Sequence, residues 1–115
     1  MGTILKSKLS GSSDGELINL ATTSSGATVI HTFCTSAEDN TYDEIYLWGY
    51  NNGTADINVT LEDGSTTLVL IQSIPAKSGL NLMLPGLIGN TSLALKGFSA
   101  LTGCGVKGFV NKISS

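Results

Sequence analysis

The chain has 115 residues, 41% of them apolar and only 13% charged, and its formal net charge is −3. This length suits one domain with a modest core and leaves no room for a second domain. The lysines are scattered, arginine is missing and no apolar run approaches the roughly 18 residues of a membrane span, so we expect neither nucleic acid nor a membrane as a partner.

The first part of the chain alternates strand-forming segments with turn clusters rich in Gly, Ser and Asp. We expect strands over residues 4–9, 16–21 and 28–34. Residues 1–15 have two interpretations. They form either the first strand of the domain or an arm in which Ile4, Leu5 and Leu9 pair with a neighbouring subunit. The β-domain proper is then expected over residues 16–115.

The segment 43–50 alternates strictly and is apolar on both faces. Ile45 and Leu47 point one way, whereas Tyr46, Trp48 and Tyr50 point the other way. If the aromatic face is exposed, it is a candidate platform for stacking on a sugar ring or for anchoring a protein interface. We expect instead that at least Trp48 packs in the core, which would remove the platform.

The remainder of the chain continues the strand pattern. The clearest alternation places Ile57, Val59 and Leu61 on one face, after the turn residues 51–53. Proline at 75 indicates a crossover between sheets at residues 74–79, and Pro85-Gly86 indicates a turn and loop. Further strands are expected over 66–71, 80–84, 92–97 and 104–113. About eight short strands without helical periodicity predict an all-β, antiparallel β-sandwich or jelly roll in a single domain.

Residues that could carry chemistry are few. The sole histidine, His31, lies in an apolar strand and is interpreted as a core or interface residue. Cys34 and Cys104 are expected to be buried thiols, with a disulfide as the alternative.

A cluster of carboxylates, Glu38, Asp39, Asp43 and Glu44, matches no calcium-loop spacing, so a solvated loop is expected. Nucleophile elbows, phosphate-binding loops and dinucleotide fingerprints do not occur in the sequence. We therefore predict a protein that is not an enzyme, with no catalytic residue, no cofactor and no metal.

Several segments together resemble the small β-sandwich virion proteins of tailed bacteriophages. The resemblance runs through residues 26–32, 44–52, 57–61 and 73–79. In that family a strand ending in asparagine closes on a short turn, a strand with alternating valines follows, and an Ile-Pro-Ala crossover precedes a leucine-rich strand. The match covers roughly residues 25–113, and it departs from the pattern at Gly89-Asn90-Thr91 and in the last strand.

The resemblance implies a structural virion protein, foremost a capsid decoration or cement protein on the outer surface of the head. Its partners would be the major capsid protein and copies of itself, for example as a trimer. A weakly charged surface rich in Ser and Thr suits such packing. The N-terminus has no signal-peptide core, so synthesis in the host cytoplasm is expected. The alternatives are a neck, tail or fibre component, or a carbohydrate- or receptor-binding module that uses Tyr46, Trp48 and Tyr50.

Overall fold

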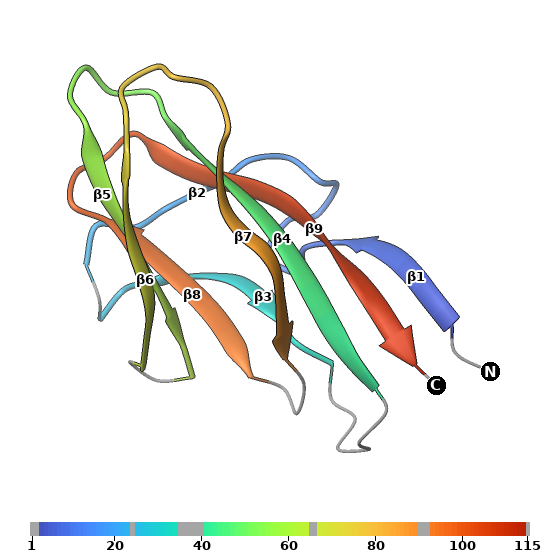
Figure 1. Cartoon of the computed structure of the whole chain (residues 1–115). Helices are drawn as coiled ribbons and strands as arrows, with labels where there is room; N and C mark the ends of the chain where they lie inside the picture. The colour runs from blue at the N-terminus through green and yellow to red at the C-terminus, as the bar shows by residue number, and fades with distance from the viewer. Residues whose placement is uncertain (1–2, 24, 35–40, 65–66, 90–92, 115) are drawn as a thin grey trace.

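β-Strands account for all the regular structure that a computed structural model describes in residues 3–23, 25–34, 41–64, 67–89 and 93–114 (Figure 1). In chain order the strands are β1 (Thr3–Lys8), β2 (Ile18–Asn19), β3 (Thr28–Thr32), β4 (Thr41–Asn51), β5 (Ile57–Asp63), β6 (Thr67–Ile74), β7 (Asn81–Gly89), β8 (Ala94–Ser99) and β9 (Cys104–Ser114). No helix occurs among these residues.

The strands form two antiparallel sheets that pack on each other. The large sheet has the order β1-β9-β4-β7, with β2 also paired to β9, and the small sheet has the order β3-β8-β5-β6. Figure 1 shows the long strands β4 and β9 side by side in the large sheet, as their pairing requires. The expected antiparallel β-sandwich is confirmed, with nine strands where about eight were predicted.

The hydrophobic core lies between the two sheets and consists mainly of branched aliphatic side chains. The small sheet contributes Ile57, Val59 and Leu61 from β5, the alternation predicted from the sequence. The large sheet contributes Val106 and Val110 from β9. Each such side chain stabilises the fold by about 1.5–3 kcal/mol relative to an exposed one, so the pairing of these inner faces sets the strand register.

The prediction that Trp48 packs in the core was wrong. Ile45 and Leu47 on β4 are the buried side chains, both with 0% exposure, and Tyr46, Trp48 and Tyr50 lie half-buried on the opposite, outward face. The sequence did not decide between the two faces, because a strand that is apolar on both has no polar side to mark the one that meets solvent. In the structure the aliphatic face of β4 packs with the core side chains of β5 and β9.

Residues 3–8 form a first strand in the chain's own sheet, which is the first of the two interpretations. β1 pairs along β9, from Thr3 opposite Ser114 to Lys8 opposite Phe109. Leu9 is buried in the core, whereas Ile4 and Leu5 are 68% and 63% exposed. The structure therefore shows no arm reaching away from the domain in this segment, because Leu9 anchors its end.

The predicted turn at Pro85-Gly86 was wrong, because both residues lie within β7. Proline is tolerated there since β7 is an edge strand, whose outer N–H groups are not needed for pairing. Gly86 has a φ of 108°, a conformation open to glycine, and the pairing with β4 shifts register on both sides of Tyr46 and Leu47. The predicted crossover at 74–79 is confirmed, since β6 and β7 belong to different sheets.

Candidate functional site

The outward side of the large sheet carries apolar, aromatic and basic side chains, where a solvated antiparallel sheet usually carries polar ones. Directly paired residues point to the same face of a sheet, so the register defines rows across β1, β9, β4 and β7. The rows are Lys6, Asn111, Glu44 and Ile88; Lys8, Phe109, Tyr46 and Pro85; and Lys107, Trp48 and Leu82. We call this surface the outer face.

Aromatic rings stack at the centre of the outer face. The rings of Tyr46 and Phe109 lie 5.1 Å apart between centroids with an interplanar angle of 18°, and those of Trp48 and Phe109 lie 6.0 Å apart at 30°. Offset stacking of this kind stabilises neighbouring rings by about 0.5–1.5 kcal/mol. Phe109 therefore packs Tyr46 and Trp48 into one aromatic cluster on the outer face.

A shallow apolar hollow of about 300 Å³ opens next to these rings. It is lined by Trp48, Leu80, Lys107, Gly108 and Phe109. Gly108 lines the hollow with its backbone, because it pairs with the buried Leu47 and is not one of the outward positions of β9. A Cβ on Gly108 would collide with the carbonyl oxygen of Tyr46, so the close approach of β9 to β4 requires glycine.

Positive charge gathers at one side of the outer face. The ammonium group of Lys6 lies 4.6 Å from the centroid of the Phe109 ring, in cation–π geometry. Lys8 and Lys107 are exposed on the same face. In the rows above the one acid is Glu44, which accepts a hydrogen bond from Asn111 Nδ2 at 3.2 Å. The outer face is therefore locally cationic although the chain has a net charge of −3.

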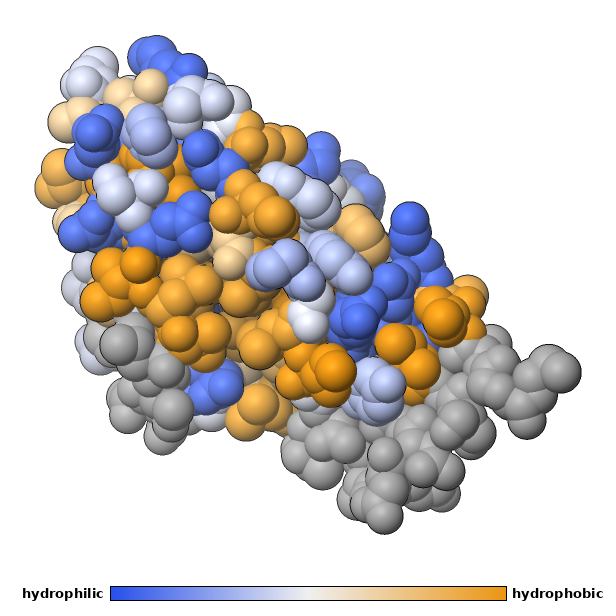
Figure 2. All heavy atoms as spheres, in the orientation of Figure 1, coloured by the Kyte–Doolittle hydropathy of each residue, from blue (hydrophilic) through white to orange (hydrophobic). Residues whose placement is uncertain are grey.

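The side of the outer face towards β7 is aliphatic. Large exposed side chains mark it: Leu80 at 56%, just before β7, and Leu82 at 49% and Ile88 at 58% within it. We call these three residues the aliphatic strip. Gln72 connects β6 and β7, because its Nε2 donates to the carbonyl of Leu82 at 3.1 Å. Figure 2 shows hydrophobic side chains gathered over β6 and β7, which is a larger apolar surface than solvent contact favours.

Tyr46 is linked to the acid of the outer face. The hydrogen bond with Glu44 raises the pKa of the Tyr46 phenol, and the negative charge of Glu44 adds to this rise. Tyr46 consequently stays neutral and keeps its hydroxyl fixed towards Glu44, which leaves the flat side of the ring against Phe109.

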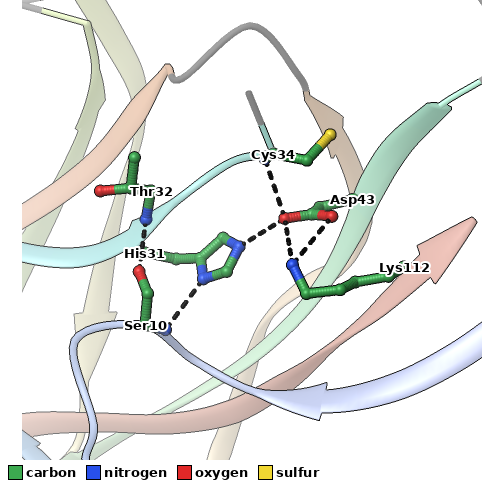
Figure 3. Close-up of polar contacts among 6 residues, drawn as sticks. All are labelled: Ser10, His31, Thr32, Cys34, Asp43 and Lys112. Atoms are coloured by element: carbon green, nitrogen blue, oxygen red, sulfur yellow. Dashed lines mark hydrogen bonds and ion pairs between the residues drawn. The ribbon is translucent and has the colours of Figure 1, made fainter. Parts of the chain in front are cut away.

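A second polar site lies inside the sandwich around Asp43 (Figure 3). His31 Nε2 lies 2.8 Å from Asp43 Oδ2, and the Cys34 N–H donates to the same oxygen at 3.1 Å. Lys112 Nζ lies 3.3 Å from Asp43 Oδ2. His31 Nδ1 accepts from the Ser10 N–H at 3.0 Å. Asp43 therefore links β3, β4 and β9, and His31 links them to Ser10, which follows β1.

These bonds assign the protonation of His31. Because Nδ1 accepts from a backbone N–H, the ring proton of the neutral form sits on Nε2 and is donated to Asp43. Burial lowers the pKa of His31, and this effect exceeds the opposing effect of Asp43. The ring is 1% exposed and both of its nitrogens are engaged, so it serves to hold the sheets together, as expected for a core histidine.

The expected solvated acidic loop does not include Asp43 and Glu44, which both lie within β4. Asp43 is buried and Glu44 lies on the outer face, because adjacent strand residues point to opposite sides. Glu38 and Asp39 lie outside the described residues. Within the described ranges, no group of three or more His, Cys, Asp or Glu side chains is arranged to hold a metal ion.

The two cysteines are not joined in a disulfide. Cys104 is buried at the start of β9, and burial raises the pKa of its thiol. Cys34 is half-buried after β3, where its backbone N–H contributes to the Asp43 site. The expectation of two buried thiols therefore holds for Cys104 and not for Cys34, which is only half-buried.

Sequence reasoning identified Tyr46, Trp48 and Tyr50 but missed the residues that complete the outer face. Phe109 and Lys107 come from β9, and Lys6 comes from β1. A signal was present, since residues 107, 109, 111 and 113 alternate with the buried Val106 and Val110. Which strand they would lie beside depended on pairings across most of the chain, which a single sequence does not reveal.

No known protein family matches the chain. A comparison with curated proteins finds no significant sequence similarity. In the part of the chain that the structure describes, no helix is long and apolar enough to cross a membrane.

Proposed function

We propose that this chain is a structural virion protein of a tailed bacteriophage and acts as a capsid decoration protein on the outer surface of the head. In this role it oligomerises, for example as a trimer, and bridges copies of the major capsid protein. The resemblance of residues 25–113 to phage β-sandwich proteins supports this assignment. The structural observation that carries it is the aliphatic strip along β7.

The aliphatic strip is suited to burial against another protein. Its three side chains are each about half exposed or more, and apolar area removed from water contributes about 25 cal/mol per Å². Stable interfaces have an apolar core with few charges, and only 13% of this chain is charged. Many such contacts repeated by capsid symmetry add up to a strong shell even when each is small.

The direct test is the number of copies of this chain in purified particles from its source, measured by quantitative mass spectrometry against the major capsid protein. A ratio near one, or a simple fraction such as about one third, is expected for a symmetric decoration protein. A handful of copies would move the assignment to the neck, tail or fibre. Its absence from particles would overturn the virion proposal.

A paired substitution tests the aliphatic strip. Leu82→Lys places a charge in the strip and is expected to abolish incorporation into particles when the variant replaces the wild-type protein. Asn58→Lys is the matched control, because Asn58 is exposed on β5 of the small sheet, and it should incorporate normally. Circular dichroism of both variants establishes that they fold. Equal incorporation of the two would contradict the role of the strip.

The exposed aromatic surface favours a second candidate function, a carbohydrate- or receptor-binding module that uses Tyr46, Trp48 and Tyr50. The supporting observation is that Trp48 stacks with Phe109 on the outer face beside the hollow. Trp48 is the only tryptophan, so indole fluorescence reports this surface alone. A fluorescence change on adding polysaccharide is expected, and no change with any polysaccharide would remove this candidate.

A further inference from the structure

We propose that the outer face binds an acidic polysaccharide, one that contains hexuronic acid. A uronate ring sits in the hollow with its C–H face on Trp48 and Phe109, and its carboxylate pairs with Lys107. This inference rests on the second candidate function and adds the ligand class to it.

The shape of the hollow fits one sugar ring. Its volume of about 300 Å³ is at the lower end of the roughly 300–1,000 Å³ typical of small-ligand sites. Trp48 and Phe109 provide apolar rings, and the backbone of Gly108 completes the lining between them and Lys107. The hollow is shallow, and Tyr46 stacks on Phe109 next to it, so the neighbouring residues of a polymer would pass over the aromatic cluster.

The charges of the site select an acidic sugar over a neutral one. Lys107 lines the hollow, and neither Lys107 nor Lys8 has an acidic partner among the residues that the structure describes. Lys6 adds a cation over Phe109. A carboxylate directly attached to a stacked ring would lie within reach of these ammonium groups, and charge-assisted hydrogen bonds are about twice as strong as neutral ones.

Other occupants fit the outer face less well. Single-stranded nucleic acid also stacks on aromatic rings, but it needs a groove of positive charge that follows its backbone, and the chain has six lysines in total, no arginine and a net charge of −3. A second copy bound through the same face would bring two cationic surfaces together. An acidic polysaccharide matches both the rings and the charge.

The experiment is a titration of the full-length protein with polygalacturonate, alginate and hyaluronan, followed by Trp48 fluorescence and calorimetry. Each polymer is paired with its carboxyl-reduced form, which keeps the sugar rings and removes the charge. Dextran sulfate and an oligothymidylate serve as polyanions without a uronate ring. At least one uronate polymer is expected to bind about tenfold more tightly than its reduced form, with a change in indole emission.

Two charge-removing variants locate the binding. Lys107→Gln is expected to weaken uronate binding about tenfold while binding of the reduced polymer stays the same. Lys96→Gln is the matched control on β8 of the small sheet and should bind as the wild type does. Trp48→Ala should lose binding of both polymer forms, and circular dichroism verifies that it folds.

The outcomes separate this inference from the function on which it rests. Equal binding of reduced and acidic polymers would leave a carbohydrate module and overturn the preference for acid. If dextran sulfate bound as tightly as every uronate polymer, general charge attraction would explain the binding. That result would overturn the proposal that a uronate ring sits in the hollow. Tight binding of the oligothymidylate alone would point to nucleic acid, and no binding of any polymer would reject both proposals.

Discussion

Gly108 in β9 lies so close to the carbonyl oxygen of Tyr46 in β4 that no side chain fits between them. The two strands are paired along their whole length, from Thr41 opposite Ser114 to Asn51 opposite Cys104. One missing side chain therefore allows this pairing, which in turn brings Tyr46, Trp48 and Phe109 together on the outer face.

Replacing Gly108 tests this close approach. Gly108→Ala is expected to lower the free energy of unfolding by about 3 kcal/mol, because the methyl group must push backbone rather than a flexible side chain. Gly15→Ala is the control, since Gly15 has a φ of 88° and no neighbour within 4 Å, and only the backbone conformation costs about 1 kcal/mol. Urea denaturation followed by Trp48 fluorescence measures both. Equal losses would contradict the steric explanation.

Asn51 should be among the most sensitive polar residues of the fold. Its Nδ2 donates to the carbonyls of Ala55 at 2.7 Å and Ile74 at 2.9 Å, and its Oδ1 accepts from the Gly53 N–H at 2.8 Å. Asn51→Ala leaves a buried carbonyl without a donor and is expected to cost about 3 kcal/mol. The control is Asn52→Ala at the exposed neighbouring position, which should lower the free energy of unfolding by under about 1 kcal/mol. Thermal unfolding of the two variants measures the difference in stability between them, and similar melting temperatures would refute the prediction.

The protein should become less stable as the pH is lowered below 6.5, because of His31. Burial holds the pKa of His31 in the folded state below its usual 6.5. Above pH 6.5 the ring is neutral in both the folded and the unfolded state, so the contribution of His31 to the free energy of unfolding is complete there. As the pH falls below 6.5 the unfolded chain takes up a proton that the folded chain does not, and the free energy of unfolding decreases until the lowered folded pKa is reached.

His31→Gln isolates this effect, because glutamine does not titrate and can still donate to Asp43. Urea denaturation at about pH 8 and about pH 5 should show a smaller loss of stability for the variant than for the wild type. The difference between the two proteins is the quantity to compare, since carboxylates titrate in both. An equal loss would show that His31 binds a proton in the folded state as readily as in the unfolded state.

Quenching of Trp48 should reveal the positive charge of the outer face. Iodide, an anion, is expected to quench the indole more efficiently than caesium at the same low ionic strength, because Lys107 lies beside Trp48 in the hollow. Lys107→Gln should reduce the advantage of iodide, and added salt should reduce it as well. A preference for caesium would mean that the field at Trp48 is negative.

The elements that depended on local pattern were the ones that the sequence predicted well. The alternation of Ile57, Val59 and Leu61 against polar neighbours defined β5, and the residues at 51–53 defined the turn before it. In β4 the same reasoning predicted the strand but not its orientation. Ile45 and Tyr46 are both apolar enough to be buried, and only the partner strands decide between them.

Long-range pairing explains the rest of what was missed. His31 and Asp43 are separated by twelve residues, and Lys112 lies a further 69 residues beyond Asp43, so the buried ion site could not be predicted from spacing. The same holds for Phe109 on the outer face, which meets Tyr46 only because β9 returns beside β4. The turn predicted at Pro85 was wrong because an edge strand tolerates a proline that a central strand would exclude.

The central place of β9 has a consequence for how the protein is made. β9 pairs with β1, β2 and β4, so the large sheet cannot close until β9 has been synthesised. Pairings of such high sequence separation slow folding, since a long loop must be closed before any contact is gained. Until then β4 lacks its main partner and offers two apolar faces to other chains. The nascent chain is therefore expected to need protection from aggregation.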